Sequence, residues 1–481
     1  MPLPAVSRAL RSPFAVDLRS VLSEQDFRRL FTTRLISQAG DGIYTAGFGA
    51  YVFFSATTYP DPAAAAEAFA VLYLPYSFIG PFAGVFIDRW SRRQILLVSA
   101  LVRAVLVTIT ALLIGSGELG IPVYVSALAA LGVNRFFLAS LSAALPHVVR
   151  DDKLVMANSV APTIGGIVTT VAGVAGIGIR LLLGGGHGSA AVIVLAAAGC
   201  YLLAGLAAAA MSRDLLGPVH EPGAAPEALA QELRDVLRGL AAGVRYLARR
   251  PGPAGALGAV GGYRVLFGIV FLMSILLYRN YFYPGGNGNA ALSHFTLLVV
   301  ATAVGYGLAA VISPVVTRRL TKHTWIALLL AVSGLVMALG GTFRQLPFLF
   351  IGFVLGLTGQ GIAISAITII QEQTSDTYRG RAFALYDMMF NGVFVAGAVV
   401  GALIIPVNGK SYPLIVVTGV GYLVAALVYA RYGADRPRQE PAAGPSSAAP
   451  GPVESPGAPE GSPGAPGGTD SPSASAQRSS S

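Results

Sequence analysis

The sequence carries little charge for its length. Of its 481 residues, 12% are charged and 54% are apolar, whereas soluble globular domains carry about 25% charged residues. Apolar runs of about twenty residues alternate with short charged segments, and a run of that length is needed to cross a bilayer core of about 30 Å. Because the runs lack two-residue alternation, they predict membrane-spanning helices and exclude a transmembrane barrel.

The sequence lacks the residues that several kinds of site require. The single cysteine, Cys200, permits neither a disulfide nor a cysteine-based metal site within one chain. Five scattered histidines show no helical pairing, and no glycine-rich loop leads into Lys-Ser/Thr. Without a nucleophile–base pair, we expect neither an enzyme nor any cofactor or metal. Residues 1–25 hold no continuous apolar stretch, so no cleavable signal peptide is expected.

Twelve apolar runs are predicted to cross the membrane. They cover residues 30–56, 64–87, 94–115, 121–144, 156–182, 189–210, 254–278, 291–313, 323–343, 346–370, 381–405 and 411–431. If both termini are cytoplasmic, the cytoplasmic segments hold 25 Lys and Arg residues and the other side holds four. This asymmetry follows the positive-inside rule and predicts an even number of spans. It also accounts for the net charge of +10 without a nucleic-acid partner.

The two halves of the chain have related features. Three pairs recur at offsets of 227 to 230 residues: Arg34 with Arg264, loop 84–93 with loop 313–322, and segment 151–158 with segment 378–385. Nearly constant offsets predict a duplicated six-helix unit with a central cavity between the copies. The predicted fold is therefore an all-α membrane protein with two pseudo-symmetric six-helix bundles, residues 30–211 and 254–431.

Three further segments flank or connect the predicted bundles. Residues 1–29 are expected to form a cytoplasmic N-terminal segment. In the cytoplasmic loop 212–253, apolar residues recur at three- and four-residue spacing, which predicts an amphipathic helix. This helix rests either on the cytoplasmic leaflet or against the base of the bundle. Residues 432–481 consist mostly of Pro, Gly, Ser and Ala, which predicts a disordered cytoplasmic tail.

The loop between the second and third predicted spans reads GVFIDRWSRR (84–93). It resembles the signature loop of the major facilitator superfamily, with serine in place of the second glycine. The resemblance implies a cytoplasmic latch formed by Gly84, Asp88, Arg89, Arg92 and Arg93 with Gly380 and Arg381. In this interpretation the arginines pair with carboxylates of other cytoplasmic segments, and the latch opens when the halves rock. The alternative interpretation is a loop that is merely positively charged.

Three other blocks, 37–42, 144–160 and 379–389, resemble the drug/proton antiporter group that includes macrolide and enterobactin exporters. This resemblance implies a multi-pass protein of a bacterial cell membrane that exchanges its cargo for protons. The blocks do not specify the cargo.

Two acidic residues lie well within predicted spans, where a charged side chain costs roughly 2.5–3.5 kcal/mol on insertion scales. Asp41 lies eleven residues into the first span, about 16 Å along the helix axis and close to the midplane. A carboxylate that alternates between water and a closed cavity can exchange protons. We therefore predict Asp41 as the proton-coupling residue, with Asp387 as the second candidate.

Basic residues within the spans are the expected partners of these carboxylates. Arg135, midway along the fourth span, and Arg34, two helical turns from Asp41, are predicted to lie in the cavity and to pair with Asp41. Arg103 and Arg264 are assigned to helix ends, where long side chains reach the membrane surface. The alternative for all of the candidate site residues is a fixed ion pair that joins helices structurally.

The favoured function is proton-coupled efflux of a small hydrophobic or amphiphilic compound, such as a drug, an antibiotic or a siderophore-like molecule, by a monomer using alternating access. The largely apolar stretch 267–282 fits such a compound better than a sugar. Two alternatives stay open. The chain is an importer of a small metabolite on the same fold, or a transport-inactive receptor or scaffold.

Overall fold

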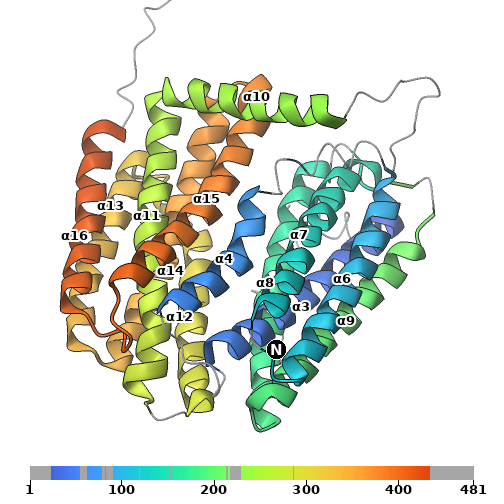
Figure 1. The fold of residues 1–481 in the computed structure, drawn as a ribbon. Coiled ribbons are helices and arrows are strands. Elements are labelled where there is room, and N and C mark those ends of the chain that lie inside the picture. Colours follow the sequence, from blue (N-terminus) through green and yellow to red (C-terminus); the bar gives the residue numbers. More distant parts are fainter. Residues whose placement is uncertain are drawn as a thin grey trace, which may run out of the picture. The chain divides into compact units, whose positions relative to one another are not determined.

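The computed structural model describes residues 23–54, 62–78, 82, 90–118, 120–150, 153–212, 215–216, 229–284 and 287–433. Every regular element within these ranges is a helix (Figure 1). The N-terminal segment before residue 23, most of the loop 84–93 and the tail after residue 433 lie outside the described residues.

Each predicted span has a helix at its place in the chain. These helices are α3 (Gln25–Phe54), α4 (Pro62–Phe78), α6 (Arg92–Gly115), α7 (Ile121–Ala144), α8 (Leu154–Leu182), α9 (Gly186–Ala209), α11 (Pro251–Leu276), α12 (Gly288–Val316), α13 (Lys322–Val336), α14 (Gln345–Gln373), α15 (Asp376–Ile404) and α16 (Tyr412–Val428). A further helix, α10 (Leu229–Ala248), lies in the predicted cytoplasmic loop 212–253. Short 3-10 or π-helical turns, η2 (Leu145–His147), η4 (Leu277–Phe282), η5 (Met337–Thr342) and η6 (Tyr429–Gly433), extend α7, α11, α13 and α16.

Ten of these helices, among the residues that the structure describes, are long and apolar enough to cross a membrane. Helix α3 is not one of the ten although it has 30 residues, because polar and charged side chains interrupt it. Helix α4 is apolar, but its apolar part is short, Pro62–Tyr73. The multi-pass architecture is thus shown, while the number twelve stays a prediction.

The contacts between helices divide the helices into two groups, which meet along a seam. Helix α3 packs against α8 and α9, and α6 packs against α7 and α9. In the second group, α11 packs against α15, α12 against α14, and α13 against α14 and α16. Helix α4 packs most extensively on α15, and α8 contacts α12, so helices from the two predicted halves meet along these pairs.

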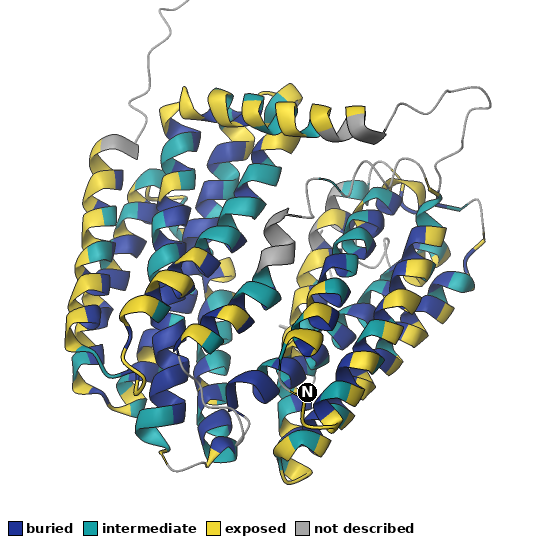
Figure 2. Cartoon of the chain, in the orientation of Figure 1, coloured by how far each residue is buried: buried dark blue, intermediate teal, exposed yellow. Residues whose placement is uncertain are grey.

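The outer faces of the helices are apolar and exposed. Figure 2 shows exposed residues along the outer faces of α6, α9 and α16, and they include Leu112, Leu206 and Val416. In water such faces would be costly, but lipid tails are as apolar as leucine. These faces are therefore suited to contact lipid, and packing between helices must depend on close fit rather than on apolar burial.

Small residues provide that close fit between α12 and α14. A Cβ placed on Gly305 would overlap the carbonyl oxygen of Phe353, and one placed on Gly356 would overlap that of Thr302. The two backbones are therefore in direct contact, an approach that only glycine permits.

Replacing Gly305 by alanine should separate α12 from α14 and lower the free energy of unfolding by about 1–3 kcal/mol, as overpacking does. Denaturant titration of the purified protein in detergent measures the loss. Gly307→Ala is the matched control, because nothing lies within 4 Å of a Cβ at that position and both substitutions change helix propensity equally. Equal destabilisation by the two substitutions would contradict the packing explanation.

Candidate functional site

A single carboxylate joins four helices inside the first group. Asp41 lies in the middle of α3, and its side chain is 13% exposed. It forms an ion pair with Arg103 of α6, whose side chain is 1% exposed. The Tyr201 hydroxyl of α9 donates to Asp41 Oδ1 over 3.0 Å, and Asn134 Nδ2 of α7 donates to Oδ2 over 3.4 Å.

The local sequence explains how these helices reach Asp41. A Cβ on Gly40 would lie 2.8 Å from the Tyr201 ring, and one on Gly42 would overlap the carbonyl oxygen of Thr169 in α8. The two glycines that flank the aspartate therefore admit α9 on one side and α8 on the other.

The Arg103 guanidinium is satisfied on several sides. Besides Asp41, it donates to Ser37 Oγ over 3.1 Å, and it lies 3.8 Å from the centroid of the Tyr201 ring. A buried charge is tolerated only when it is paired and hydrogen-bonded. Protonation of Asp41 would remove the negative partner of Arg103, so the state of this carboxylate bears on the whole cluster.

The assignment of Arg103 to a helix end is therefore wrong, and so is the prediction that Arg135 pairs with Asp41. Arg103 lies nine residues beyond the predicted start of its span at residue 94, about 14 Å at 1.5 Å per residue. An arginine that deep needs a carboxylate or a backbone carbonyl group as its partner. This depth was the signal in the sequence that could have marked Arg103 as a buried charge, although it does not identify Asp41 as the partner.

Arg135 instead forms an ion pair with Asp387, across the two groups of helices. Arg135 Nη1 of α7 lies 3.6 Å from Asp387 Oδ2 of α15, and the side chains are 14% and 50% exposed. Two candidate residues that the sequence placed in different halves therefore come together.

The Arg135–Asp387 pair lines a cavity of about 460 Å³ between α7, α14 and α15. The other lining side chains are mostly apolar, and among them are Leu138, Ile367, Phe383 and Met388, with Ser142 and Tyr386 as polar members. Such a volume and such a lining are typical of a small-molecule site.

The cavity lies toward one end of the helices. Helix α10 lies across the ends of α11 and α15, which it contacts (Figure 1), and this end is called the α10 side below. The lining residues come from the last third of α7, the last turns of α14 and the first half of α15. All three segments lie toward the α10 side.

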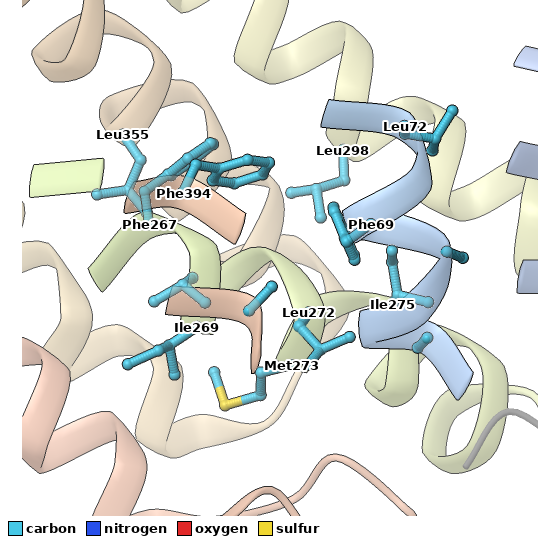
Figure 3. Close-up of a cluster of buried hydrophobic side chains, with 14 of the residues drawn as sticks. Phe69, Leu72, Phe267, Ile269, Leu272, Met273, Ile275, Leu298, Leu355 and Phe394 are labelled. Carbon is cyan, nitrogen blue, oxygen red and sulfur yellow. The ribbon is translucent and has the colours of Figure 1, made fainter. Parts of the chain in front are cut away.

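Away from the α10 side, aromatic rings fill the seam between the groups. The Phe69 ring of α4 has its centroid 5.5 Å from that of Phe271 in α11 and 5.6 Å from that of Phe394 in α15. Figure 3 shows Phe69 and Phe394 within a cluster of apolar side chains that includes Phe267 and Leu298. We call Phe69, Phe271 and Phe394 the aromatic seam.

The end of α3 completes this closure. Arg279 Nη1, in the turn after α11, donates to the carbonyl oxygen of Phe54 over 2.9 Å. The Phe54 ring lies 5.2 Å from that of Phe295 in α12. The structure therefore combines a cavity toward the α10 side with packed aromatic contacts toward the other side.

The predicted latch is described only in part. Gly84, Asp88 and Arg89 lie outside the described residues. Gly380 is exposed, with open space around it. Arg381 packs against Gly239 and Gly243 of α10, and its predicted partner Asp88 lies outside the described residues.

Arg92 and Arg93 differ from the predicted pairing with carboxylates. Arg93 donates to the carbonyl oxygens of Ala209 and Met211, over 2.6 and 2.7 Å. Arg92 donates to the carbonyl oxygen of Leu216 and contacts His147. Both arginines thus satisfy carbonyl groups at and just beyond the C-terminal end of α9, where cations are favoured.

Two further arginines lie within helices, Arg34 half-buried and Arg264 buried. Arg34 Nε donates to Gln38 Oε1 of its own helix over 3.1 Å. Arg264 is not at a helix end, contrary to the prediction, but in the middle of α11 and 5% exposed. Its Nε donates to the Phe390 carbonyl oxygen over 2.7 Å, and its guanidinium lies 3.9 and 4.4 Å from the ring centroids of Phe390 and Phe394.

Membrane-spanning helices that enclose ion pairs and a cavity define a polytopic membrane transporter. Two curated relatives are 34% identical over 412 residues, which are 85% of this chain and 91% of the relative. They are the uncharacterized MFS-type transporters Rv0037c of Mycobacterium tuberculosis and Mb0038c of Mycobacterium bovis. The family model of the Major Facilitator Superfamily matches residues 281–463. The chain belongs to this superfamily and is a membrane transporter.

Solved structures share the fold. A mutant of the nucleoside transporter NupG aligns with a TM-score of 0.61 and 15% identity, over 84% of this chain and 98% of that chain. The POT family transporter PepTSo aligns with a TM-score of 0.59 and 12% identity, over 84% of this chain and 97% of that chain. At these identities the similarity concerns the fold alone.

A double-mutant cycle tests the Asp41–Arg103 pair. Asp41→Asn and Arg103→Met should each lower the free energy of unfolding by about 3–5 kcal/mol, because each leaves a buried polar group without its charged partner. The double substitution should cost less than the sum of the two, with a coupling of about 0.5–3 kcal/mol. Glu67→Gln, at an exposed carboxylate of α4, should change little. Strictly additive losses would contradict the pairing.

Proposed function

We propose that the protein is a secondary active transporter that exports a small hydrophobic or amphiphilic compound in exchange for protons. In this proposal α3 and α4 join the ten helices above as membrane spans, which makes twelve. The α10 side and both termini face the cytoplasm of a bacterial cell, and the protein works as a monomer in the cell membrane.

The distribution of basic residues supports this orientation. The turn between α12 and α13, on the α10 side, carries Arg318, Arg319 and Lys322, whereas the loop between α15 and α16, on the other side, carries Lys410 alone. Lys and Arg are retained on the cytoplasmic side of membrane proteins.

Cysteine labelling tests the orientation, because Cys200 is the only native cysteine. In a Cys200→Ser background, Val407→Cys should react with a membrane-impermeant maleimide in intact cells. Leu320→Cys should react only after permeabilisation. Both positions carry exposed side chains, and three helices separate them along the chain. The opposite labelling pattern would reverse the proposed orientation in the membrane. If both cysteines were labelled from one side, the number of membrane spans between them would be wrong.

The observation that carries the proposal is the Asp41 cluster. Its carboxylate is the acidic member of a network built from α3, α6, α7 and α9. When a proton reaches Asp41, the negative charge that pairs with Arg103 is lost. The ion pair that connects the helices around Asp41 is then weakened. A proton and a rearrangement of the first group are thus linked at one atom pair, as exchange against protons requires.

The Arg135–Asp387 pair supplies the second element of the mechanism. It connects α7 with α15 beside the cavity, so the pair must separate if the two groups move apart on the α10 side. A substrate with a polar group can take the place of either partner. We propose Asp41 as the coupling residue and Arg135 and Asp387 as cavity residues, whereas Arg34 is not among the side chains that line this cavity. Gly84, Asp88, Arg89, Arg92, Arg93, Gly380 and Arg381 remain the proposed latch.

The cavity supports a compact amphiphilic cargo. Its volume of about 460 Å³ lies within the range of about 300–1,000 Å³ for small-molecule sites. Its lining combines apolar side chains with one ion pair, one tyrosine and one serine. Few hydrogen-bonding groups are available for a polyhydroxylated cargo, so an apolar body with a single polar group fits best.

Proteoliposomes with an imposed proton gradient test the coupling. The wild type should move a fluorescent amphiphilic compound against its concentration gradient. Asp41→Asn should lose at least about tenfold of this gradient-driven rate, as expected when an essential proton-transfer group is removed. In exchange of labelled for unlabelled compound without a gradient, Asp41→Asn should retain transport, which separates lost coupling from misfolding.

Glu67→Gln is the matched control and should behave as the wild type in both assays. If uphill transport survives in Asp41→Asn, Asp41 is not the coupling residue. Uptake in the direction of the proton flux would favour an importer instead. Absence of any transport across a broad panel of compounds, by protein shown to be folded, would favour a receptor or scaffold.

A further inference from the structure

Helix α10 presents a dense group of arginines at its C-terminal end. Arg245, Arg249 and Arg250 lie within six consecutive residues, and residues 239–250 contain no acidic side chain. All three arginines are exposed. Arg249 and Arg250 follow directly after the end of α10. Like charges this close repel each other, so this surface is favoured when an anion lies among the guanidinium groups.

These arginines line a shallow, open pocket. The cavity has a volume of about 430 Å³ and is lined by Ala242, Arg245, Tyr246, Arg249, Arg250 and Tyr378. Tyr246 of α10 and Tyr378 of α15 form its rigid wall, because their rings stack 4.2 Å apart with an interplanar angle of 5°. The Tyr246 hydroxyl accepts a hydrogen bond from Ser375 N over 3.0 Å, which fixes α10 to the start of α15.

The three guanidinium groups are not equally engaged. Arg250 Nη1 donates to the Gln373 carbonyl oxygen over 2.8 Å, and its guanidinium lies 4.5 Å from the Tyr246 ring centroid. Arg245 Nε donates to the carbonyl oxygen of Ala241 in its own helix over 3.4 Å. Neither Arg245 nor Arg249 has an acidic partner among the described side chains. Two planar donor groups are thus available at the cavity, and they match the oxygen atoms of a phosphate.

An exposed apolar stripe runs beside the arginines. Leu237 and Val244, seven residues apart and therefore on one face of α10, are 55% and 51% exposed. Ala241 and Ala248 continue the same face and are exposed. An exposed apolar stripe beside a row of arginines is the arrangement of a helix that lies in the interface of a bilayer.

From this combination we infer that the cavity between α10 and α15 binds the phosphate group of an anionic phospholipid, held by Arg245 and Arg249. The apolar stripe of Leu237 and Val244 contacts the acyl chains of the same leaflet. A free phosphate ion has the charge but no use for the apolar stripe, so the structure favours the lipid.

Retention of lipid by the full-length purified protein tests this inference. The protein is incubated with equal amounts of phosphatidylglycerol and phosphatidylcholine in detergent, and native mass spectrometry counts the retained lipids. The wild type should retain phosphatidylglycerol preferentially. Arg245→Gln with Arg249→Gln should reduce this preference by about tenfold, since each basic residue near an anionic surface contributes measurably to lipid binding.

The matched control is Arg234→Gln with Arg238→Gln, which removes the same charge from the same helix outside the cavity. It should leave the preference unchanged, and both variants should unfold like the wild type. An equal loss in the control would show diffuse attraction rather than a site and would overturn the inference. Displacement of phosphatidylglycerol by millimolar inorganic phosphate would identify a free-phosphate site and would equally overturn the lipid assignment.

Discussion

The buried pair of Asp41 and Arg103 is the constraint on which the first group of helices depends. Neither charge is tolerable alone in a membrane, so every helix that surrounds the pair must supply a partner or a close approach. Tyr201 and Asn134 supply the partners, and Gly40 supplies the approach. One costly carboxylate therefore fixes the relative positions of α3, α6, α7 and α9, and any change in its charge must be shared by all four.

Among the residues that the structure describes, the second group of helices has no carboxylate beside its deepest arginine. Its deepest arginine, Arg264, is held by the carbonyl oxygen of Phe390 and by the rings of Phe390 and Phe394. A ring and a carbonyl group cannot take up a proton as a carboxylate can. The two groups resemble each other in sequence offset but differ in electrostatics. We infer that the first group responds to protons, whereas the second holds its deepest arginine with groups that do not titrate.

Much of the fold could be predicted from the sequence, because apolar runs of membrane length specify helices almost independently of tertiary structure. The importance of Asp41 was equally visible, since a mid-membrane carboxylate is rare. Its partner was not. Which arginine meets Asp41 depends on the rotation and approach of α6 against α3, and a span assigned from hydropathy alone contains no such information. The carbonyl contacts of Arg92 and Arg93 were missed for the same reason, because the loop beyond α9 is adjacent only in space.

Helix α15 connects the regions that the proposed transport cycle must coordinate. Arg381 packs on α10, Asp387 pairs with Arg135 at the cavity, and Phe394 belongs to the aromatic seam. These residues lie six and seven positions apart on one continuous helix, about 20 Å from the first to the last at 1.5 Å per residue. Because a helix transmits displacement along its length, α15 cannot release the aromatic seam without disturbing the ion pair. Opening on one side and closure on the other are thereby linked through a single element.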